Sequence, residues 1–212
     1  MTLENRHRIN LAIMASGSGT NAENLILFAR NQSDFEINVC CVISNIEDAG
    51  VLKKATKLGV ETHIVPKIKN ESRIEHEKRI IDILSRYEVD WICLAGYMRV
   101  LSPTFLDHFF DTKKNISRII NIHPSLLPDF PGLNAYEQAF DAKVEESGAT
   151  VHFVDQGVDT GPVIMQMSFK RDPDDSLESF KAKGMKNEYK LYPQALIKII
   201  NKYNCNSSNK GQ

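Results

Sequence analysis

The sequence predicts a three-layer α/β/α fold around a mostly parallel, twisted, Rossmann-like sheet of about seven strands, with an antiparallel C-terminal portion. Up to residue 123, short apolar runs rich in β-branched residues alternate with longer stretches of helical periodicity. Parallel strands that are buried on both faces have this character. After residue 123 the pattern changes to a proline-rich loop and two further strand-like runs, which indicates an antiparallel addition.

Five apolar runs predict the parallel strands, at residues 9–15, 37–44, 62–65, 91–95 and 119–123. The runs at 149–154 and 163–169 are expected to form an antiparallel hairpin, since Gly157 and Gly161 lie in the loop between them. Cys40 and Cys41 are neighbours in one strand, so we expect their side chains on opposite faces of the sheet. The four cysteines show no CxxC or metal-ligand spacing, and we expect reduced, structural thiols and no metal.

Helices are predicted between these strands, at residues 21–31, 48–58, 71–87, 103–110 and 136–142. The apolar face of the 71–87 helix is expected to consist of Ile74, Ile80, Ile81 and Leu84. Ser102 and Pro103 are an N-cap and a first helical residue. A capping box at residues 175–178 opens a terminal helix that reaches about residue 203, and Pro193 is expected to kink or interrupt it.

The composition is that of an ordinary globular protein, with 42% apolar and 25% charged residues and a formal net charge of −1 over 212 residues. This length suits a single domain over residues 1–203 and a flexible polar tail at 204–212. Balanced charge provides no general attraction to nucleic acids or anionic membranes. No apolar run approaches the ~20 residues of a membrane span, and the first eight residues lack the apolar stretch of a secretory signal. We therefore expect a cytoplasmic protein with small-molecule partners, neither nucleic acid nor membrane.

A glycine-rich turn, Ser16-Gly17-Ser18-Gly19-Thr20-Asn21, joins the first strand to the first helix. Glycines let the backbone approach an anion, and the N–H groups and dipole of a helix start favour negative charge. Three interpretations stay open on this segment alone: a phosphate monoester, a dinucleotide, or a tight turn without ligand. A dinucleotide site would need an acidic residue where the second strand ends at Ser44-Asn45. The P-loop lysine is also absent.

A polar pair, Asn121 and His123, ends the fifth strand before a stiff loop, Pro124-Ser125-Leu126-Leu127-Pro128. Residues two apart on a strand face the same side, and open α/β sheets bind ligands at the carboxyl ends of their strands. An amide N–H can stabilise an oxyanion, and histidine can exchange a proton near neutral pH. The loop at 154–162 offers two candidate acids, Asp155 and Asp159, but these are ordinary turn residues and position alone gives Asp159 little weight. If it lies near His123, the Asp159 carboxylate would hold the imidazole in place. Ser125 does not lie in a nucleophile elbow, so a serine hydrolase is disfavoured.

Four motifs together make the chain resemble the phosphoribosylglycinamide formyltransferases, folate-dependent enzymes of purine synthesis. The resemblance covers about residues 9–203. Its motifs are Gly17-Ser18-Gly19-Thr20-Asn21, the segment 94–103 (LAGYMRVLSP), the segment 121–128 (NIHPSLLP), and 151–154 (VHFV) with 159–162 (DTGP). Other formyl-folate enzymes share the histidine-proline segment, and the combination points to this family. The family pattern often has Asn at Ser18 and Gly at Thr160.

The resemblance implies roles for particular residues. It implies a phosphate-binding half at about 9–110 and a folate-binding, catalytic half at about 111–203, with 10-formyltetrahydrofolate as formyl donor and no metal. Asn121, His123 and Asp159 are the implied catalytic trio. The implied phosphate cradle is Gly19, Thr20 and Asn21. Contacts to the ribonucleotide are implied for Met185, Lys186, Asn187 and Glu188. Contacts to folate are implied for Arg73, Met98, Arg99, Val100, Leu101, Asp155, Gln156, Gly157, Val158 and Asp159. The Leu127–Pro128 peptide bond is expected to be cis, and a homodimer is allowed.

Other functions remain open at this point. A methionyl-tRNA formyltransferase would be expected to carry a further C-terminal domain and a basic surface. A formyl-folate hydrolase would use the same trio with water as nucleophile and would carry an extra N-terminal domain. A non-catalytic nucleotide-binding module would need the phosphate loop without the trio. Without the resemblance, Arg73 and Glu188 would be read as surface residues, Met98 as core, and His152 as a core or supporting histidine.

Overall fold

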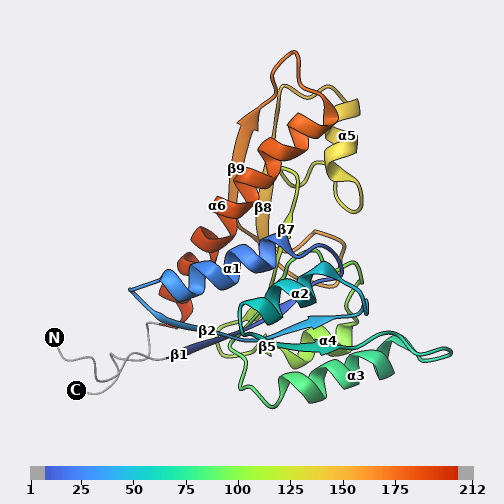
Figure 1. The fold of residues 1–212 in the computed structure, drawn as a ribbon, viewed down its shortest axis with the longest axis vertical. Coiled ribbons are helices and arrows are strands. Elements are labelled where there is room, and N and C mark those ends of the chain that lie inside the picture. Colours follow the sequence, from blue (N-terminus) through green and yellow to red (C-terminus); the bar gives the residue numbers. More distant parts are fainter. Residues whose placement is uncertain (1–7, 205–212) are drawn as a thin grey trace. The chain divides into compact units, whose positions relative to one another are not determined.

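The computed structural model describes residues 8–204, so the predicted tail lies almost wholly outside the described residues. It contains a seven-stranded sheet with the strand order β3-β2-β1-β4-β7-β8-β9 and a separate two-stranded sheet, β5-β6 (Figure 1). Two compact units divide the described residues: 8–110 with 117–120, and 111–116 with 121–204. The predicted α/β class, mostly parallel with an antiparallel C-terminal part, is confirmed.

The first unit is built from parallel strands with helical connections. Its strands are β1 (Arg8–Met14), β2 (Glu36–Ser44), β3 (Glu61–Ile64) and β4 (Trp91–Leu94), with parallel pairing of β1 to β2, β1 to β4 and β2 to β3. Its helices are α1 (Thr20–Asn31), α2 (Gly50–Lys57), α3 (Arg73–Leu84) and α4 (Pro103–His108). Leu11, Ile13 and Ile92 are fully buried in the strands, as expected for a sheet covered on both faces.

The second unit carries an antiparallel hairpin and the longest helix. β8 (Glu146–Phe153) pairs antiparallel with β9 (Val163–Lys170), as predicted. The hairpin packs against α6 (Leu177–Tyr203), which also contacts α5 (Ala135–Asp141) (Figure 1). β7 (Ile119–His123) precedes the loop 124–134, in which the Leu127–Pro128 peptide bond is cis as expected. Two very short strands, β5 (Phe110–Asp111) and β6 (Ile116–Ser117), were not predicted.

The buried face of α3 differs from the predicted one. Ile74 is 45% exposed, whereas His76 and Glu77 are buried beside Ile80 and Leu84. A ring nitrogen of His76 hydrogen-bonds the Val65 carbonyl. Glu77 accepts from the backbone N–H and the hydroxyl of Ser102, the residue that caps α4 as predicted. Buried polar groups need such partners, and these partners come from other elements, which helical periodicity does not indicate.

A β-bulge corrects the expectation for the paired cysteines. Leu11 pairs with Val39 and Ala12 pairs with Cys41, so Cys40 is an extra residue between them. Its thiol donates to the Leu11 carbonyl at 3.0 Å and hydrogen-bonds the Cys41 thiol. The two side chains therefore do not point to opposite faces, because a bulge breaks the strict alternation of a strand. Cys40, Cys41 and Cys93 carry free thiols.

The start of α6 also differs by one residue. Ser176 is the N-cap, and its side chain accepts from the Ser179 N–H, so the predicted box that begins at Asp175 is wrong. The Asp175 carboxylate instead accepts from the Asp172 N–H and the Ser179 hydroxyl and pairs with Lys183. The helix continues through Pro193 without interruption.

Candidate active site

His123 lies at the end of β7, buried between two hydrogen-bond acceptors. Its side chain is 5% exposed, and Nδ1 lies 3.1 Å from the Asp159 carboxylate. Nε2 lies 2.8 Å from the Phe130 carbonyl oxygen. A carbonyl and a carboxylate can only accept, so only the doubly protonated imidazolium donates to both. Both ring nitrogens of His123 thus face acceptors.

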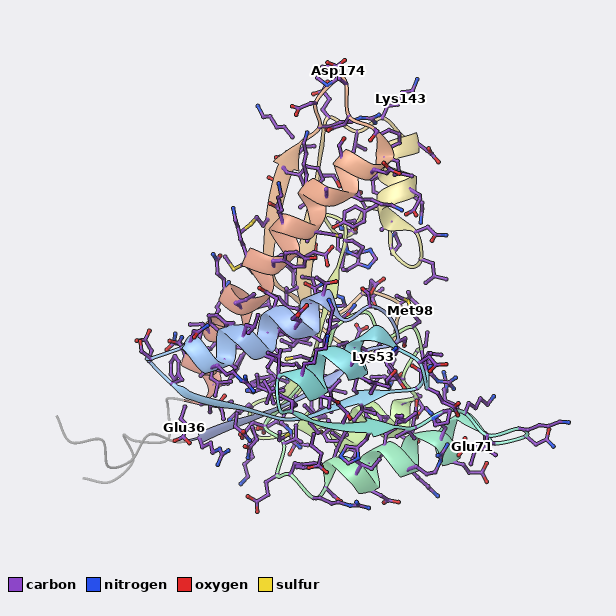
Figure 2. The ribbon with its side chains drawn as sticks, in the orientation of Figure 1. Glu36, Lys53, Glu71, Met98, Lys143 and Asp174 are labelled. Atoms are coloured by element: carbon purple, nitrogen blue, oxygen red, sulfur yellow. The ribbon has the colours of Figure 1, made fainter. Side chains whose placement is uncertain are left out.

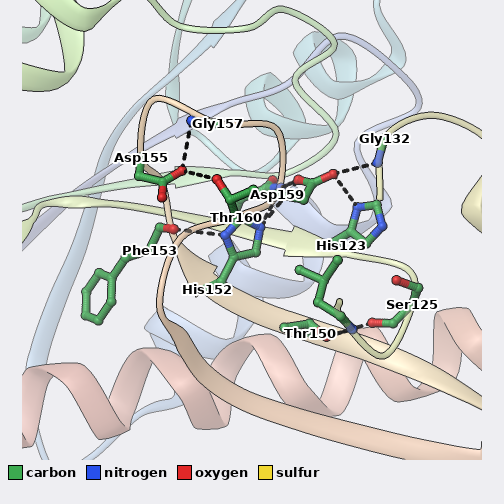
Figure 3. A network of polar contacts seen from close by, with 12 residues as sticks. His123, Ser125, Gly132, Thr150, His152, Phe153, Asp155, Gly157, Asp159 and Thr160 are labelled. Carbon is green, nitrogen blue, oxygen red and sulfur yellow. Dashed lines mark hydrogen bonds and ion pairs between the residues drawn. The ribbon is translucent and has the colours of Figure 1, made fainter. Parts of the chain in front are cut away.

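Asp159 connects the predicted trio. Oδ2 accepts from the Gly132 N–H at 2.8 Å and faces His123, while Oδ1 lies 3.4 Å from Asn121 Nδ2 and 3.5 Å from His152 Nε2 (Figure 3). Burial raises the pKa of the Asp159 carboxyl. The hydrogen bond with His152, the Gly132 N–H and the His123 charge outweigh burial, so this pKa lies below its ordinary value. Asp159 is therefore an anion at neutral pH.

Asn121 is held less tightly than His123. Its Nδ2 lies 3.4 Å from Asp159 Oδ1 and 3.3 Å from His152 Nε2, both longer than the usual ~2.9–3.0 Å of an N–H hydrogen bond. The amide N–H groups can therefore turn to a new acceptor at modest cost. His152 Nδ1 donates to the Phe153 carbonyl at 2.9 Å, and its Nε2 lies near both Asn121 Nδ2 and Asp159 Oδ1.

The loop after β8 is closed by its own side chains. The Asp155 carboxylate accepts from the Gly157 N–H at 3.0 Å and from the Thr160 hydroxyl at 2.7 Å (Figure 3). Asp159 itself has a φ of 55°, in the left-handed region that non-glycine residues seldom adopt. Thr160 thus supplies a hydroxyl that fastens the loop, where the family pattern often has glycine. Gln156 and Val158 are exposed on this loop.

The predicted phosphate loop lies in the first unit, where Gly19 is the N-cap of α1 with a φ of 75° and no side-chain cap. A Cβ at Gly19 would lie 2.4 Å from the Val51 Cβ, so only glycine fits this close approach to α2. Thr20 and Asn21 are the first two residues of the helix. Without a capping side chain, the first turn presents backbone N–H groups suited to an anion.

Of the residues matched to folate contacts, Arg73 and residues 98–101 lie in the first unit with the phosphate loop, and residues 155–159 lie in the second unit. Ser16 links the phosphate loop to the segment that holds residues 98–101, because its N–H donates to the Gly96 carbonyl and its hydroxyl accepts from the Met98 N–H at 3.0 Å. Met98, labelled in Figure 2, and Val100 are 65% and 54% exposed, while Leu101 is buried. Exposed apolar side chains beside a polar loop suit a flat apolar ligand. Arg73 is exposed at the start of α3, and Arg99 is partly buried.

The residues matched to ribonucleotide contacts lie on α6. Met185 and Lys186 are exposed, whereas Glu188 is only 7% exposed and accepts a hydrogen bond from the Tyr136 hydroxyl. The Nδ2 atom of Asn187 is buried without a hydrogen-bond partner among the described residues. Reading Glu188 as an ordinary surface residue, the alternative without the family, is therefore wrong.

His152, expected to be a core or supporting histidine, is buried and contacts both Asn121 and Asp159. Sequence reasoning missed two further groups that hold the trio. They are the Phe130 carbonyl and the Gly132 N–H. Both are backbone groups, and no pattern of side chains indicates their contacts. Among residues 8–204, no cluster of three or more His, Cys, Asp or Glu side chains could hold a metal ion. In the same range, no helix is both long and apolar enough to cross a membrane.

Comparisons with known proteins identify relatives of this chain. The chain is 38% identical over 183 residues to the phosphoribosylglycinamide formyltransferase of Haemophilus influenzae, which covers 86% of this chain and 83% of that protein. It is 38% identical over 197 residues to the trifunctional purine biosynthetic protein adenosine-3 of Drosophila melanogaster. That match covers 92% of this chain but 14% of the Drosophila protein, so the chain spans a small part of it.

Solved structures give the same result. The crystal structure of glycinamide ribonucleotide transformylase 1 from Symbiobacterium toebii matches with a TM-score of 0.85 and 36% identity. The match covers 92% of this chain and 90% of that one. The family model described as "Formyl transferase" matches residues 9–196. The resemblance carried by the four motifs is thus confirmed, and the chain belongs to the formyl transferase family.

Proposed function

We propose that this protein transfers the formyl group of 10-formyltetrahydrofolate to the amine of glycinamide ribonucleotide. The products are formylglycinamide ribonucleotide and tetrahydrofolate, in de novo purine biosynthesis. The observation that carries the proposal is the Asp159 carboxylate, which lies 3.1 Å from His123 Nδ1 and 3.4 Å from Asn121 Nδ2. A base or acid, an amide donor and an anion that orients them are the groups that acyl transfer to an amine requires.

The chemistry is direct acyl transfer without a covalent enzyme intermediate. When the amine attacks the formyl carbon, negative charge develops on the formyl oxygen and positive charge on the nitrogen. The Asn121 amide and the charged His123 stabilise the oxygen. Loss of one such donor typically costs roughly 10²–10³ in rate. His123 already has an acceptor at each ring nitrogen, so a direct hydrogen bond to substrate requires sharing or replacing one of them.

Asp159 has two tasks in this scheme. Its depressed pKa keeps Asp159 ionised, and the ionised carboxylate faces His123 Nδ1 and holds the ring in place. It also steers a water molecule that carries the proton from the attacking amine to the departing folate nitrogen. Gly132 supports both tasks, because its N–H fixes Oδ2 toward His123.

Substrate contacts follow the family motif. Gly19, Thr20 and Asn21 receive the phosphate of the ribonucleotide at the uncapped start of α1. Met185, Lys186, Asn187 and Glu188 contact the rest of that substrate. Folate packs on Arg73, on residues 98–101 and on the loop 155–159. Holding both reactants in reacting geometry supplies much of the remaining acceleration.

Cytoplasmic location and a single functional domain over residues 1–203 form part of the same proposal. The free thiols of Cys40, Cys41 and Cys93 support a reducing compartment. A homodimer also stays a prediction, which sedimentation at micromolar concentration would test.

The assay that tests this function follows loss of the formyl donor at saturating 10-formyltetrahydrofolate. We expect tetrahydrofolate to form only when glycinamide ribonucleotide is added, with one formylated ribonucleotide per donor consumed. Donor loss without ribonucleotide would indicate a hydrolase, and formylation of methionyl-tRNA would indicate the tRNA enzyme. Absence of donor loss under all conditions would favour a binding module.

A further inference from the structure

Glu188 is a buried carboxylate with a phenol as its partner. Tyr136 on α5 and Glu188 on α6 are 9% and 7% exposed, and the Tyr136 hydroxyl donates to Glu188 Oε1. Acidic side chains are seldom this buried unless they are hydrogen-bonded. The pairing joins residues 52 positions apart within the second unit, so the fold maintains it across two helices.

A glycine in α6 makes room for the tyrosine ring. Phe180, Gly184 and Glu188 follow one another at four-residue spacing, so they share one face of α6. A Cβ on Gly184 would lie 2.2 Å from Cε1 of Tyr136 and 2.4 Å from its hydroxyl oxygen. The Phe180 ring meets the Tyr136 ring edge-on, with centroids 6.3 Å apart. The ring therefore lies across α6 at Gly184, and packing fixes where its hydroxyl points.

The hydroxyl stays a donor under working conditions. Burial and the neighbouring Glu188 carboxylate raise the pKa of Tyr136 well above its ordinary value. A carboxylate offers about four acceptor positions on two oxygens, and the Tyr136 hydroxyl donates to Oε1. A carboxylate can only accept, so the groups that it binds are donors, and the vicinal hydroxyls of a ribose are donors of the right kind.

We propose that Tyr136 is a positioning residue that fixes the Glu188 carboxylate as an acceptor for the ribose hydroxyls of the substrate. This rests on the proposed function, since it takes the substrate to be a ribonucleotide that contacts Glu188. Tyr136 does not touch the reacting atoms in this scheme. It acts through Glu188, so it should affect ribonucleotide binding far more than the chemical step.

The aromatic cluster around Tyr136 also supports His123, through Phe130. Phe130 packs against the cluster of Tyr136, Ala139 and Phe180, and its carbonyl accepts from His123 Nε2. Removing the Tyr136 ring would therefore disturb the histidine as well. Removing only the hydroxyl leaves this packing in place and isolates the effect on Glu188.

Tyr136→Phe is thus the informative variant. We expect the KM for glycinamide ribonucleotide to rise about tenfold, as for loss of a hydrogen bond to a charged group, with kcat changed less than about threefold. The KM for the formyl donor should stay the same. Tyr87→Phe is the matched control, because it also removes a part-buried hydroxyl contact, to His63, at a residue with no proposed role in binding. Its kinetic constants should equal those of the wild type.

A ribose-deoxy analogue and a double variant separate positioning from general damage. The wild type should discriminate against an analogue that lacks a ribose hydroxyl, and Tyr136→Phe should discriminate less. Glu188→Gln should raise the same KM, and adding Tyr136→Phe to Glu188→Gln should have little further effect. The double variant has no buried unpaired charge, so it remains informative if Tyr136→Phe alone folds poorly.

The outcomes distinguish the two proposals. A wild type that turns over glycinamide ribonucleotide, with a Tyr136→Phe variant identical to it, overturns the inference alone. Equal losses in kcat and in both KM values, or additive effects of Tyr136→Phe and Glu188→Gln, also overturn it. A wild type that does not formylate the ribonucleotide overturns the proposed function, and the inference with it.

Discussion

The start of α1 and the network around Asp159 prepare for a ligand in different ways. At α1 the backbone forms the site: Gly19 adopts a φ of 75° against Val51, and no side chain caps the helix. Around Asp159 the side chains form the site, since His123, Asn121 and His152 all approach one carboxylate. The first site depends on shape and the second on charge and proton positions. Substitutions at the two should therefore separate substrate binding from chemistry.

The largest expected effect is at His123. We expect His123→Asn to lower turnover by at least ~10², because the ring's charge and both its N–H donors are lost. Binding of glycinamide ribonucleotide, measured by calorimetry, should change little. Near-normal turnover in this variant would show that His123 has no catalytic role. Loss of ribonucleotide binding would contradict the separation of binding at the start of α1 from chemistry around Asp159.

Gly19→Ala should weaken ribonucleotide binding and leave turnover largely intact. A non-glycine residue in the left-handed region costs about 1–3 kcal/mol, and the new Cβ also meets Val51 at 2.4 Å. We expect lower thermal stability and a KM for the ribonucleotide raised about tenfold, with kcat largely kept. Gly17→Ala is the matched control, because a Cβ there meets nothing within 4 Å; its stability should stay within about 0.5 kcal/mol of the wild type. Equal behaviour of the two variants would contradict this account of the turn.

His152→Gln should have a smaller effect than His123→Asn. His152 acts only through its contacts with Asn121 and Asp159, which are 3.3 and 3.5 Å long. We expect kcat to fall roughly tenfold or less, as for loss of a weak hydrogen bond, with both KM values retained. His63→Gln, which alters a histidine bonded to Tyr87, is the control. A loss as large as that of His123→Asn would mean that His152 contacts the reacting groups.

The smallest effect concerns stability and pH. The pKa of Asp159 is lower in the folded protein than its ordinary value of 3.8, so its ionised form stabilises the fold. This contribution is fully present above the unfolded pKa and is lost as pH falls through the folded pKa. Urea unfolding of wild type and Asp159→Asn should show a constant difference near neutral pH that shrinks below pH ~4. A difference that grows on acidification would have the wrong sign.

Features of the structure that depend on the local sequence pattern were predicted. Features that depend on contacts between residues far apart in the chain were not. The strands of the first unit were predicted to within one or two residues, because buried parallel strands must be apolar throughout. The glycine turn at residues 16–21 was also predicted, because its glycines can be read from the local sequence. In contrast, Ile74 was wrongly expected inside, and the helical pattern did not indicate that Glu77 is buried, because the partner of Glu77, Ser102, lies in another element.

The candidate site was predictable in part. Asn121 and His123 share a strand face, which spacing alone indicates. Asp159 lies in a segment of ordinary turn residues, and its place in the trio came from the family motif. The contacts of the Phe130 carbonyl, the Gly132 N–H and the Tyr136 hydroxyl could be identified only from the structure. They depend on how the loop 124–134 and α6 fold. Contacts between residues far apart in the chain leave no local pattern.

The most direct test of the central claim is the single-turnover rate of Asp159→Asn with both substrates saturating. The substitution preserves size but removes the charge that holds His123 and guides the proton. We expect the rate of formyl transfer to fall by at least ~10² while ribonucleotide still binds at the start of α1. A single-turnover rate close to that of the wild type would contradict the account.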